Sequence, residues 1–128
     1  MAADRPAETA PAPDRSRILV VDDAADAREV IQTQLEDQGF RVAACSSVEE
    51  ALALLAATPF DLIITDLRMP GMDGYQLTET IRASDPDVTI VWLTGYRGPD
   101  TRLAAERLSV FRCLDKPLTV AQIRELVA

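Results

Sequence analysis

The chain of 128 residues has no histidine, two cysteines and a single lysine among its 13 basic residues. The usual ligands of a structural zinc ion are therefore too few to form such a site. Cys45 and Cys113 lie in apolar stretches, so we expect two buried free thiols rather than a disulfide. No apolar run approaches the roughly 18 residues of a membrane span. The N-terminus lacks the basic-then-apolar order of a signal peptide, and we expect a cytoplasmic protein without membrane contact.

Positive charge is also scarce in this sequence. Asp and Glu number 21 against 13 Lys and Arg, which gives a net charge of −8. A nucleic-acid phosphate backbone would repel so acidic a domain, so we expect no direct nucleic-acid binding. The same charge disfavours docking on anionic membranes. The length is that of one domain with a real core.

The chain divides into a short leader and one domain. Residues 1–16 hold three prolines among alanines without apolar periodicity, which predicts a disordered leader before a domain at 17–128. In that domain short apolar runs alternate with segments of helical spacing. The expected strands are 17–21, 40–45, 61–65, 88–93 and 110–114. The expected helices are 25–38, a segment after Ser47 that Pro59 ends, 74–84, 99–108 and 119–127.

This alternation predicts an α/β fold of the (βα)₅ type. We expect a doubly wound, five-stranded parallel sheet of flavodoxin-like order 2-1-3-4-5, with helices on both faces. In such sheets, binding sites form outside the carboxyl ends of the strands, where the strand order reverses. The residues at those ends are therefore the candidates for function.

The strand ends carry acidic residues, a hydroxyl and the lone lysine. The first strand ends at Asp22 and Asp23, the third at Asp66, the fourth at Thr94, and the fifth just before Lys116. Crowded carboxylates repel each other, and either a hard divalent cation such as Mg²⁺ or a nearby ammonium relieves that repulsion. A compact ammonium fits beside a phosphoryl group where a broad guanidinium does not. The set therefore indicates a Mg²⁺-dependent phosphoryl site.

Each of these residues also has an ordinary structural explanation. Asp22 and Asp23 could cap the helix that follows them, because helix N-termini favour acidic side chains. Asp66 could begin a turn, Thr94 could satisfy loop backbone, and Lys116 could be a surface lysine. The functional interpretation depends on their occurring together.

Four fragments give the chain a family resemblance. These are "VVDD" at 20–23, "DLIITDLRMPGMDG" at 61–74, "LTGY" at 93–96 and "LDKPL" at 114–118. In this order and spacing they resemble the receiver domain of two-component response regulators. The resemblance covers residues 17–127.

The resemblance implies roles for the acidic residues. Asp66 is expected to be the phosphoacceptor. Asp23 and Asp66 would bind Mg²⁺ through their side chains together with the backbone carbonyl of Arg68, while Asp22 would act through a bound water. A carboxylate is a suitable nucleophile for phosphoryl transfer, in agreement with this assignment.

The resemblance also implies a partner and an output. Thr94 would hydrogen-bond the phosphoryl group and Lys116 would pair with it. The donor would be a phosphohistidine on a sensor histidine kinase or phosphotransfer protein, because this chain has no histidine of its own. Beyond self-phosphorylation and slow self-dephosphorylation, no enzymatic turnover is expected. A homodimer through the fourth helix, fifth strand and fifth helix is a further expectation.

Three positions depart from the family pattern. Where an aromatic ring usually precedes the lysine by three residues, this chain has Cys113. Arg68 places a long cation two residues after the phosphoacceptor, and Gly95 leaves the position after Thr94 without a side chain. We expect Tyr96 to carry the conformational response and Cys113 to be passive packing.

Two other functions fit parts of the pattern. A degenerate receiver would bind partners without phosphorylation, and a metal-dependent phosphohydrolase of similar topology would turn over small phosphate esters. Mg²⁺-dependent incorporation of acetyl phosphate or beryllofluoride separates the first from a working receiver. Because the chain ends barely one helix past Lys116, we expect a free-standing or truncated receiver.

Overall fold

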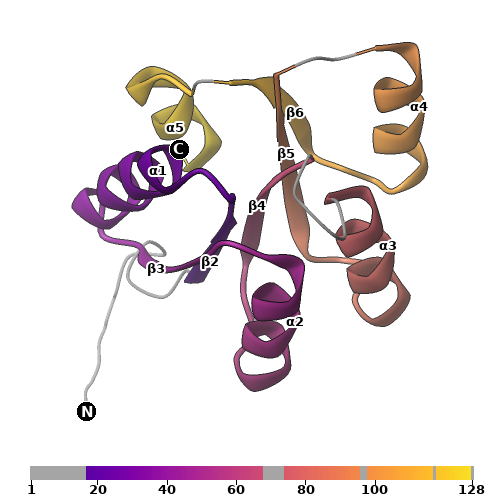
Figure 1. The fold of residues 1–128 in the computed structure, drawn as a ribbon, viewed down its shortest axis with the longest axis horizontal. Coiled ribbons are helices and arrows are strands. Elements are labelled where there is room, and N and C mark those ends of the chain that lie inside the picture. Colours follow the sequence, from indigo (N-terminus) through magenta and orange to yellow (C-terminus); the bar gives the residue numbers. More distant parts are fainter. Residues whose placement is uncertain (1–16, 68–73, 96–97, 117, 128) are drawn as a thin grey trace.

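The computed structural model describes residues 17–67, 74–95, 98–116 and 118–127. In these residues five strands alternate with five helices (Figure 1). The strands are β2 (Arg17–Val21), β3 (Arg41–Cys45), β4 (Leu62–Asp66), β5 (Thr89–Thr94) and β6 (Arg112–Asp115). The helices are α1 (Ala25–Asp37), α2 (Val48–Ala57), α3 (Gly74–Ser84), α4 (Pro99–Arg107) and α5 (Val120–Val127). The expected leader, 1–16, lies outside the described residues.

The strands form one parallel sheet in the order β3-β2-β4-β5-β6. Counted along the chain this is 2-1-3-4-5, so the predicted fold class and strand order are confirmed. The order reverses between β2 and β4, which pair directly, with Val21 opposite Thr65. The residues that follow Val21 and those that end β4 therefore meet at one edge of the sheet.

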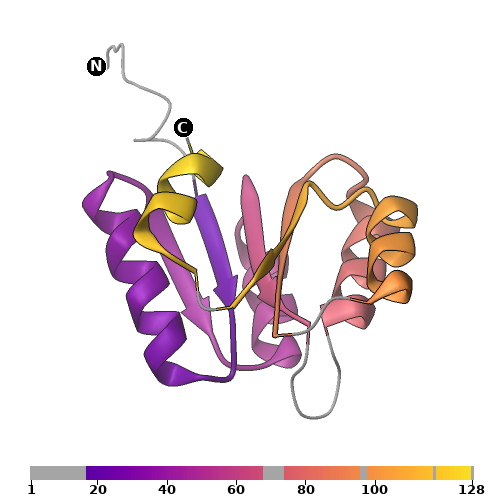
Figure 2. The same ribbon diagram turned by 90° about the horizontal axis from the view of Figure 1, so that it is seen from above.

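Helices cover both faces of the sheet. Figures 1 and 2 show α1 and α5 on one face and α2, α3 and α4 on the other. Each face has its own apolar core, because strands buried on both sides place alternate residues in each core. One core contains Leu19, Val21, Ile63, Leu77, Ile81, Ile90 and Trp92; the other contains Ile18, Val20, Ile31, Leu35, Ile64, Val91, Leu93 and Ile123. No helix within the described ranges is long and apolar enough to cross a membrane.

Hydroxyl side chains cap the starts of α2 and α5, which begin directly after Ser47 and Thr119. Before α5, the Gln122 amide N–H donates to Thr119 Oγ1 at 3.1 Å, and the Thr119 N–H donates to Gln122 Oε1 at 2.9 Å. Before α2, the Glu50 N–H donates to Ser47 Oγ at 3.2 Å, but the Glu50 carboxylate accepts from the N–H of Ser46 at 2.9 Å. In the usual capping box, the carboxylate accepts from the N–H of the N-cap residue itself. Here the Glu50 carboxylate reaches one residue further back, to Ser46 instead of Ser47.

The last strand differs from expectation. It was expected at 110–114, but β6 spans Arg112–Asp115, and it is only half-buried because it lies at one edge of the sheet. Cys113 is accordingly half-buried, which corrects the expected buried thiol, whereas Cys45 is buried. Neither cysteine forms a disulfide. Burial, with a smaller contribution from the charge of Glu50, raises the pKa of the Cys45 thiol to about 11.

Replacing Gly74 with Ala is expected to destabilise the protein by about 1–3 kcal/mol, the usual range for overpacking. A Cβ at this position would overlap the backbone carbonyl oxygen of Asp66, which lies in a central strand and cannot easily move. Gly95→Ala is the matched control, because a Cβ there meets no atom within 4 Å. Urea unfolding of both variants measures the difference. Equal losses of stability would contradict this close contact.

Candidate functional site

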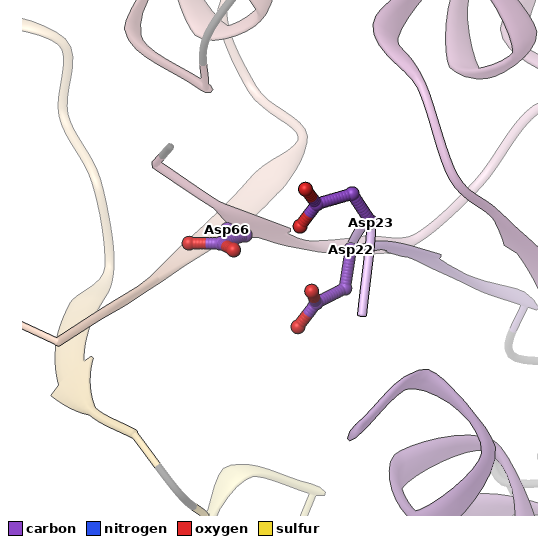
Figure 3. A group of neighbouring side chains, drawn as sticks. All are labelled: Asp22, Asp23 and Asp66. Carbon is purple, nitrogen blue, oxygen red and sulfur yellow. The ribbon is translucent and has the colours of Figure 1, made fainter. Parts of the chain in front are cut away.

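Three carboxylates meet where β2 and β4 end. Asp22 and Asp23 follow the last residue of β2, and Asp66 is the last residue of β4. One carboxylate oxygen from each lies within 4.8 Å of those from the other two. Figure 3 shows the three side chains gathered at this edge. The structure thus brings together the three aspartates that the strand pattern predicted to be neighbours.

Asp22 is fully buried. Its Oδ1 accepts a hydrogen bond of 2.9 Å from the N–H of Ala24, and its backbone carbonyl accepts one of 2.7 Å from Arg28 Nη1. Its Oδ2 lies 3.2 Å from Lys116 Nζ but not in hydrogen-bonding geometry, so this oxygen is buried without a hydrogen bond. Burial raises the pKa of the Asp22 carboxyl above its ordinary value, against the Ala24 hydrogen bond and the Lys116 charge.

Lys116 is the cation of the site. Its Nζ donates to Asp66 Oδ2 at 3.1 Å, and its side chain is 25% exposed. Its backbone N–H donates to the carbonyl of Thr94 at 2.9 Å, which ties the end of β6 to the end of β5. Burial lowers the pKa of Lys116, but the hydrogen bond to Asp66 and the charges of Asp22 and Asp66 together raise it above its ordinary value.

In the Asp22–Lys116 pair, the surroundings favour the charged form of Lys116 but the neutral form of Asp22. The ammonium retains contact with water, so its attraction to two carboxylates outweighs its loss of solvation. The Asp22 carboxylate retains none, so its loss of solvation outweighs the attraction to one ammonium. Three carboxylates and one ammonium leave this cluster with excess negative charge. Its donor atoms are oxygens, which suits a hard cation such as Mg²⁺.

Of the other predicted site residues, the structure describes Thr94, Gly95 and Cys113. Thr94 ends β5 and is buried, whereas Gly95 is exposed with open space where a side chain would lie. Cys113 lies in the half-buried β6, beside a groove along α4. Arg68 and Tyr96 lie outside the described residues. The predicted Mg²⁺ contact of the Arg68 carbonyl and the predicted switch role of Tyr96 therefore stay predictions.

Two supporting contacts were not predicted from the sequence. Arg28 lies in α1 and donates to the Asp22 carbonyl, a contact set by the angle at which α1 leaves the sheet. Gly74 begins α3 directly against the backbone of Asp66, and its N–H donates to the Leu67 carbonyl at 3.0 Å. The glycine was a visible signal, because a glycine is typical where two backbones approach closely. Nothing in the sequence distinguishes Arg28 from the other arginines, of which the chain has 12 in all.

Comparison with known proteins decides the family. The sequence model described as the response regulator receiver domain matches residues 18–128. The chain belongs to the response regulator receiver domain family. Receiver domains are signalling modules of two-component systems, generally without enzymatic activity, and they work with histidine kinases or phosphotransfer proteins. The resemblance seen in the sequence is thereby confirmed.

Individual relatives agree with this family. The response regulator protein PilR of Pseudomonas aeruginosa is 36% identical over 114 residues, which are 89% of this chain and 26% of PilR. The chemotaxis protein CheY4 of Vibrio cholerae has a TM-score of 0.83 at 26% identity, covering 88% of this chain and 95% of CheY4. The beryllofluoride-activated NtrC4 receiver domain dimer has a TM-score of 0.81 at 27% identity, covering 87% and 92%. This receiver thus spans about a quarter of PilR.

Replacing Asp22 with Asn is expected to raise the free energy of unfolding of the receiver at neutral pH in the presence of a chelator. Because the pKa of Asp22 is raised, the folded protein binds this proton more tightly than the unfolded chain. The free energy of unfolding of the wild type therefore falls as the pH rises from 3.8 through the raised pKa. Asn carries no charge and avoids this loss.

Urea unfolding at a series of pH values measures the effect. The advantage of Asp22→Asn should be full at neutral pH and shrink as the pH falls toward 3.8, the ordinary pKa of an aspartate. Asp87→Asn, at an exposed position before β5, is the matched control and should show no such trend. A variant less stable than wild type at neutral pH would contradict the cost assigned to the buried charge.

Proposed function

We propose that this receiver is a phosphorylation-controlled switch that accepts a phosphoryl group on Asp66. The donor is a phosphohistidine of a sensor histidine kinase or phosphotransfer protein. The observation that supports this proposal is the contact of 3.1 Å between Asp66 Oδ2 and Lys116 Nζ, within a cluster of three carboxylates at the strand edge. A nucleophile with an adjacent fixed ammonium matches the charge distribution of phosphoryl transfer.

The transfer exchanges one bond of phosphorus for another. A carboxylate oxygen of Asp66 forms a bond to phosphorus while the bond from phosphorus to the donor's imidazole nitrogen breaks. The imidazole leaves neutral, because it retains the proton on its other nitrogen. Lys116 faces the oxygens on which negative charge accumulates, and the Thr94 hydroxyl donates to one of them in the phosphorylated state. Slow hydrolysis of the acyl phosphate restores Asp66.

The acidic cluster is proposed to hold Mg²⁺. Asp23 and Asp66 would bind it through their carboxylates, together with the Arg68 carbonyl, and Asp22 would act through water. The fit rests on the buried Oδ2 of Asp22 and on the excess negative charge of the cluster. When bound, Mg²⁺ supplies positive charge to the phosphoryl oxygens. The residues of the chain orient the nucleophile and provide the fixed ammonium.

We extend the proposal to self-association through α4, β6 and α5. Large apolar side chains in or next to these elements are exposed, namely Leu103 of α4 at 63%, Phe111 before β6 at 58% and Val120 of α5 at 39%. A related receiver, that of NtrC4, forms a dimer when activated by beryllofluoride.

The proposed donor also implies that the domain acts in the cytoplasm.

Replacing Asp66 with Asn is expected to abolish Mg²⁺-dependent phosphoryl uptake, because the amide has no nucleophilic carboxylate oxygen. The measurement is incubation with acetyl phosphate followed by intact-mass spectrometry. Asp87→Asn is the matched control and should take up one phosphoryl group as the wild type does. Uptake by Asp66→Asn at the wild-type rate would reject Asp66 as the acceptor. A wild type that takes up nothing would favour a degenerate receiver, and turnover of phosphate esters would favour a phosphohydrolase.

Asp23→Ala is expected to weaken Mg²⁺ binding more than Asp22→Ala does, since losing a direct ligand costs more than losing one that acts through water. Loss of the Asp22 carboxylate, which acts through water, is expected to weaken Mg²⁺ affinity by about 10–100-fold. Mg²⁺ titration followed by the fluorescence of Trp92, which lies two residues before Thr94, measures both variants. Equal dissociation constants would show that the two aspartates do not differ in this way.

A further inference from the structure

The first turn of α3 rests directly on the backbone of the proposed acceptor. Gly74 begins α3, and its Cα is so close to the Asp66 carbonyl that a Cβ would overlap it. The Gly74 N–H also donates to the carbonyl of Leu67 at 3.0 Å. Any displacement of the backbone at Asp66 must therefore be taken up by the start of α3.

The same turn is fixed to the interior of β5. Trp92 is fully buried, and its Nε1–H donates to Thr78 Oγ1 at 2.8 Å. Thr78 Oγ1 in turn donates to the Gly74 carbonyl at 2.7 Å. Both hydroxyl and indole are buried, so these hydrogen bonds cannot exchange readily with water. The turn from Gly74 to Thr78 consequently moves with β5 as one unit.

Tyr75 connects this unit to α4. Its ring meets the Trp92 ring edge to face, with centroids 4.9 Å apart and planes at 68°. Its hydroxyl lies 3.1 Å from Oγ1 of Thr101 in the first turn of α4. Thr101 is 7% exposed, and its Oγ1 also accepts a longer hydrogen bond of 3.4 Å from the N–H of Gly98, the N-cap of α4. One hydroxyl pair thus joins the start of α3 to the start of α4.

The opposite end of α4 is held more firmly. Arg82, near the end of α3, donates to the carbonyls of Leu108 at 2.8 Å and Ser109 at 3.1 Å, just after α4. The same guanidinium donates to the carbonyl of Val88 at 2.7 Å, before β5. Two charged hydrogen bonds therefore fix the C-terminal end of α4, whereas within the described residues the contact from α3 to its N-terminal end is a neutral hydroxyl pair. The N-terminal end is the one that a small force can displace.

We propose that Tyr75 is a positioning residue that couples the state of Asp66 to α4 through its hydrogen bond to Thr101. This inference rests on the proposed function, which supplies the change at Asp66. The displaced element also forms a surface, because Thr101 and Cys113 line the same groove of about 590 Å³ between α4 and β6. Movement of the α4 N-terminus therefore changes the groove beside Cys113. The coupling needs no contribution from the Cys113 side chain.

The test removes the two hydroxyls separately and together. The variants are Tyr75→Phe, Thr101→Val and the double variant, which form a double-mutant cycle. Thr80→Val is the matched control, because the Thr80 hydroxyl, also in α3, donates to the Gln76 carbonyl of its own helix. Amide hydrogen exchange of residues 99–107 is measured with and without saturating beryllofluoride and Mg²⁺. Phosphoryl uptake from acetyl phosphate is measured separately for every variant.

We expect beryllofluoride to change the exchange of 99–107 in the wild type and in Thr80→Val. Tyr75→Phe and Thr101→Val should each lose most of that change, and the double variant should lose no more than either. Without beryllofluoride, Tyr75→Phe should exchange about fivefold faster in this segment, as expected for one lost hydrogen bond. Thr101→Val should exchange faster still, because it also loses the hydrogen bond from the Gly98 N–H. All variants should still take up a phosphoryl group. Thr101→Val provides the test from the α4 side if Tyr75→Phe does not fold.

Four results overturn the coupling and leave the proposed function intact, and the first two concern the wild type and the single variants. They are a wild-type protein that takes up a phosphoryl group without any change in 99–107, and single variants that keep the full change. Additive losses in the double variant, or an equal loss in Thr80→Val, also reject the assigned contact. Failure of the wild type to take up a phosphoryl group overturns the proposed function and the coupling with it. The uptake measurement therefore distinguishes the two failures.

Discussion

Two carboxylates share one ammonium at the edge where β2 and β4 end, and the rest of the site depends on this unequal pairing. Asp22 is fully buried, yet only one of its two oxygens has a hydrogen bond. Such a charge is costly unless opposite charge lies beside it. Lys116 supplies part of that charge and is itself held by the backbone of Thr94. The folded receiver is thus short of positive charge at the place where a cation would bind.

The fold was predictable because its signals are local. Apolar runs such as the one ending at Val21 mark strands, and capping residues such as Thr119 mark helix starts, so the alternation and the parallel sheet follow. The acidic cluster followed from the sheet, since parallel strands end at one edge. The lone lysine was informative because the chain otherwise uses arginine. Placing it beside Asp66 required only the strand order.

The features that were not predicted depend on how the helices pack and on how deeply a strand is buried, and the residue pattern does not reveal either. The contact of Arg28 with the Asp22 carbonyl follows from the direction in which α1 leaves the sheet, and one arginine among many does not reveal it. The Tyr75–Thr101 contact joins residues 26 apart through the packing of two helices. Cys113 was predicted to be buried from its apolar neighbours, but an outer strand leaves such residues half-buried.

The order of the site residues along the chain has a consequence for synthesis. Asp22 and Lys116 are 94 residues apart, and Asp66 and Lys116 are 50 apart. A nascent chain that has not yet released β6 from the ribosome can pair β2 with β4, but it carries their crowded carboxylates without the ammonium. Contacts of such long range form late, because loop closure must precede them. The charge arrangement of the site is therefore complete only when the last strand docks and brings Lys116 beside the two aspartates.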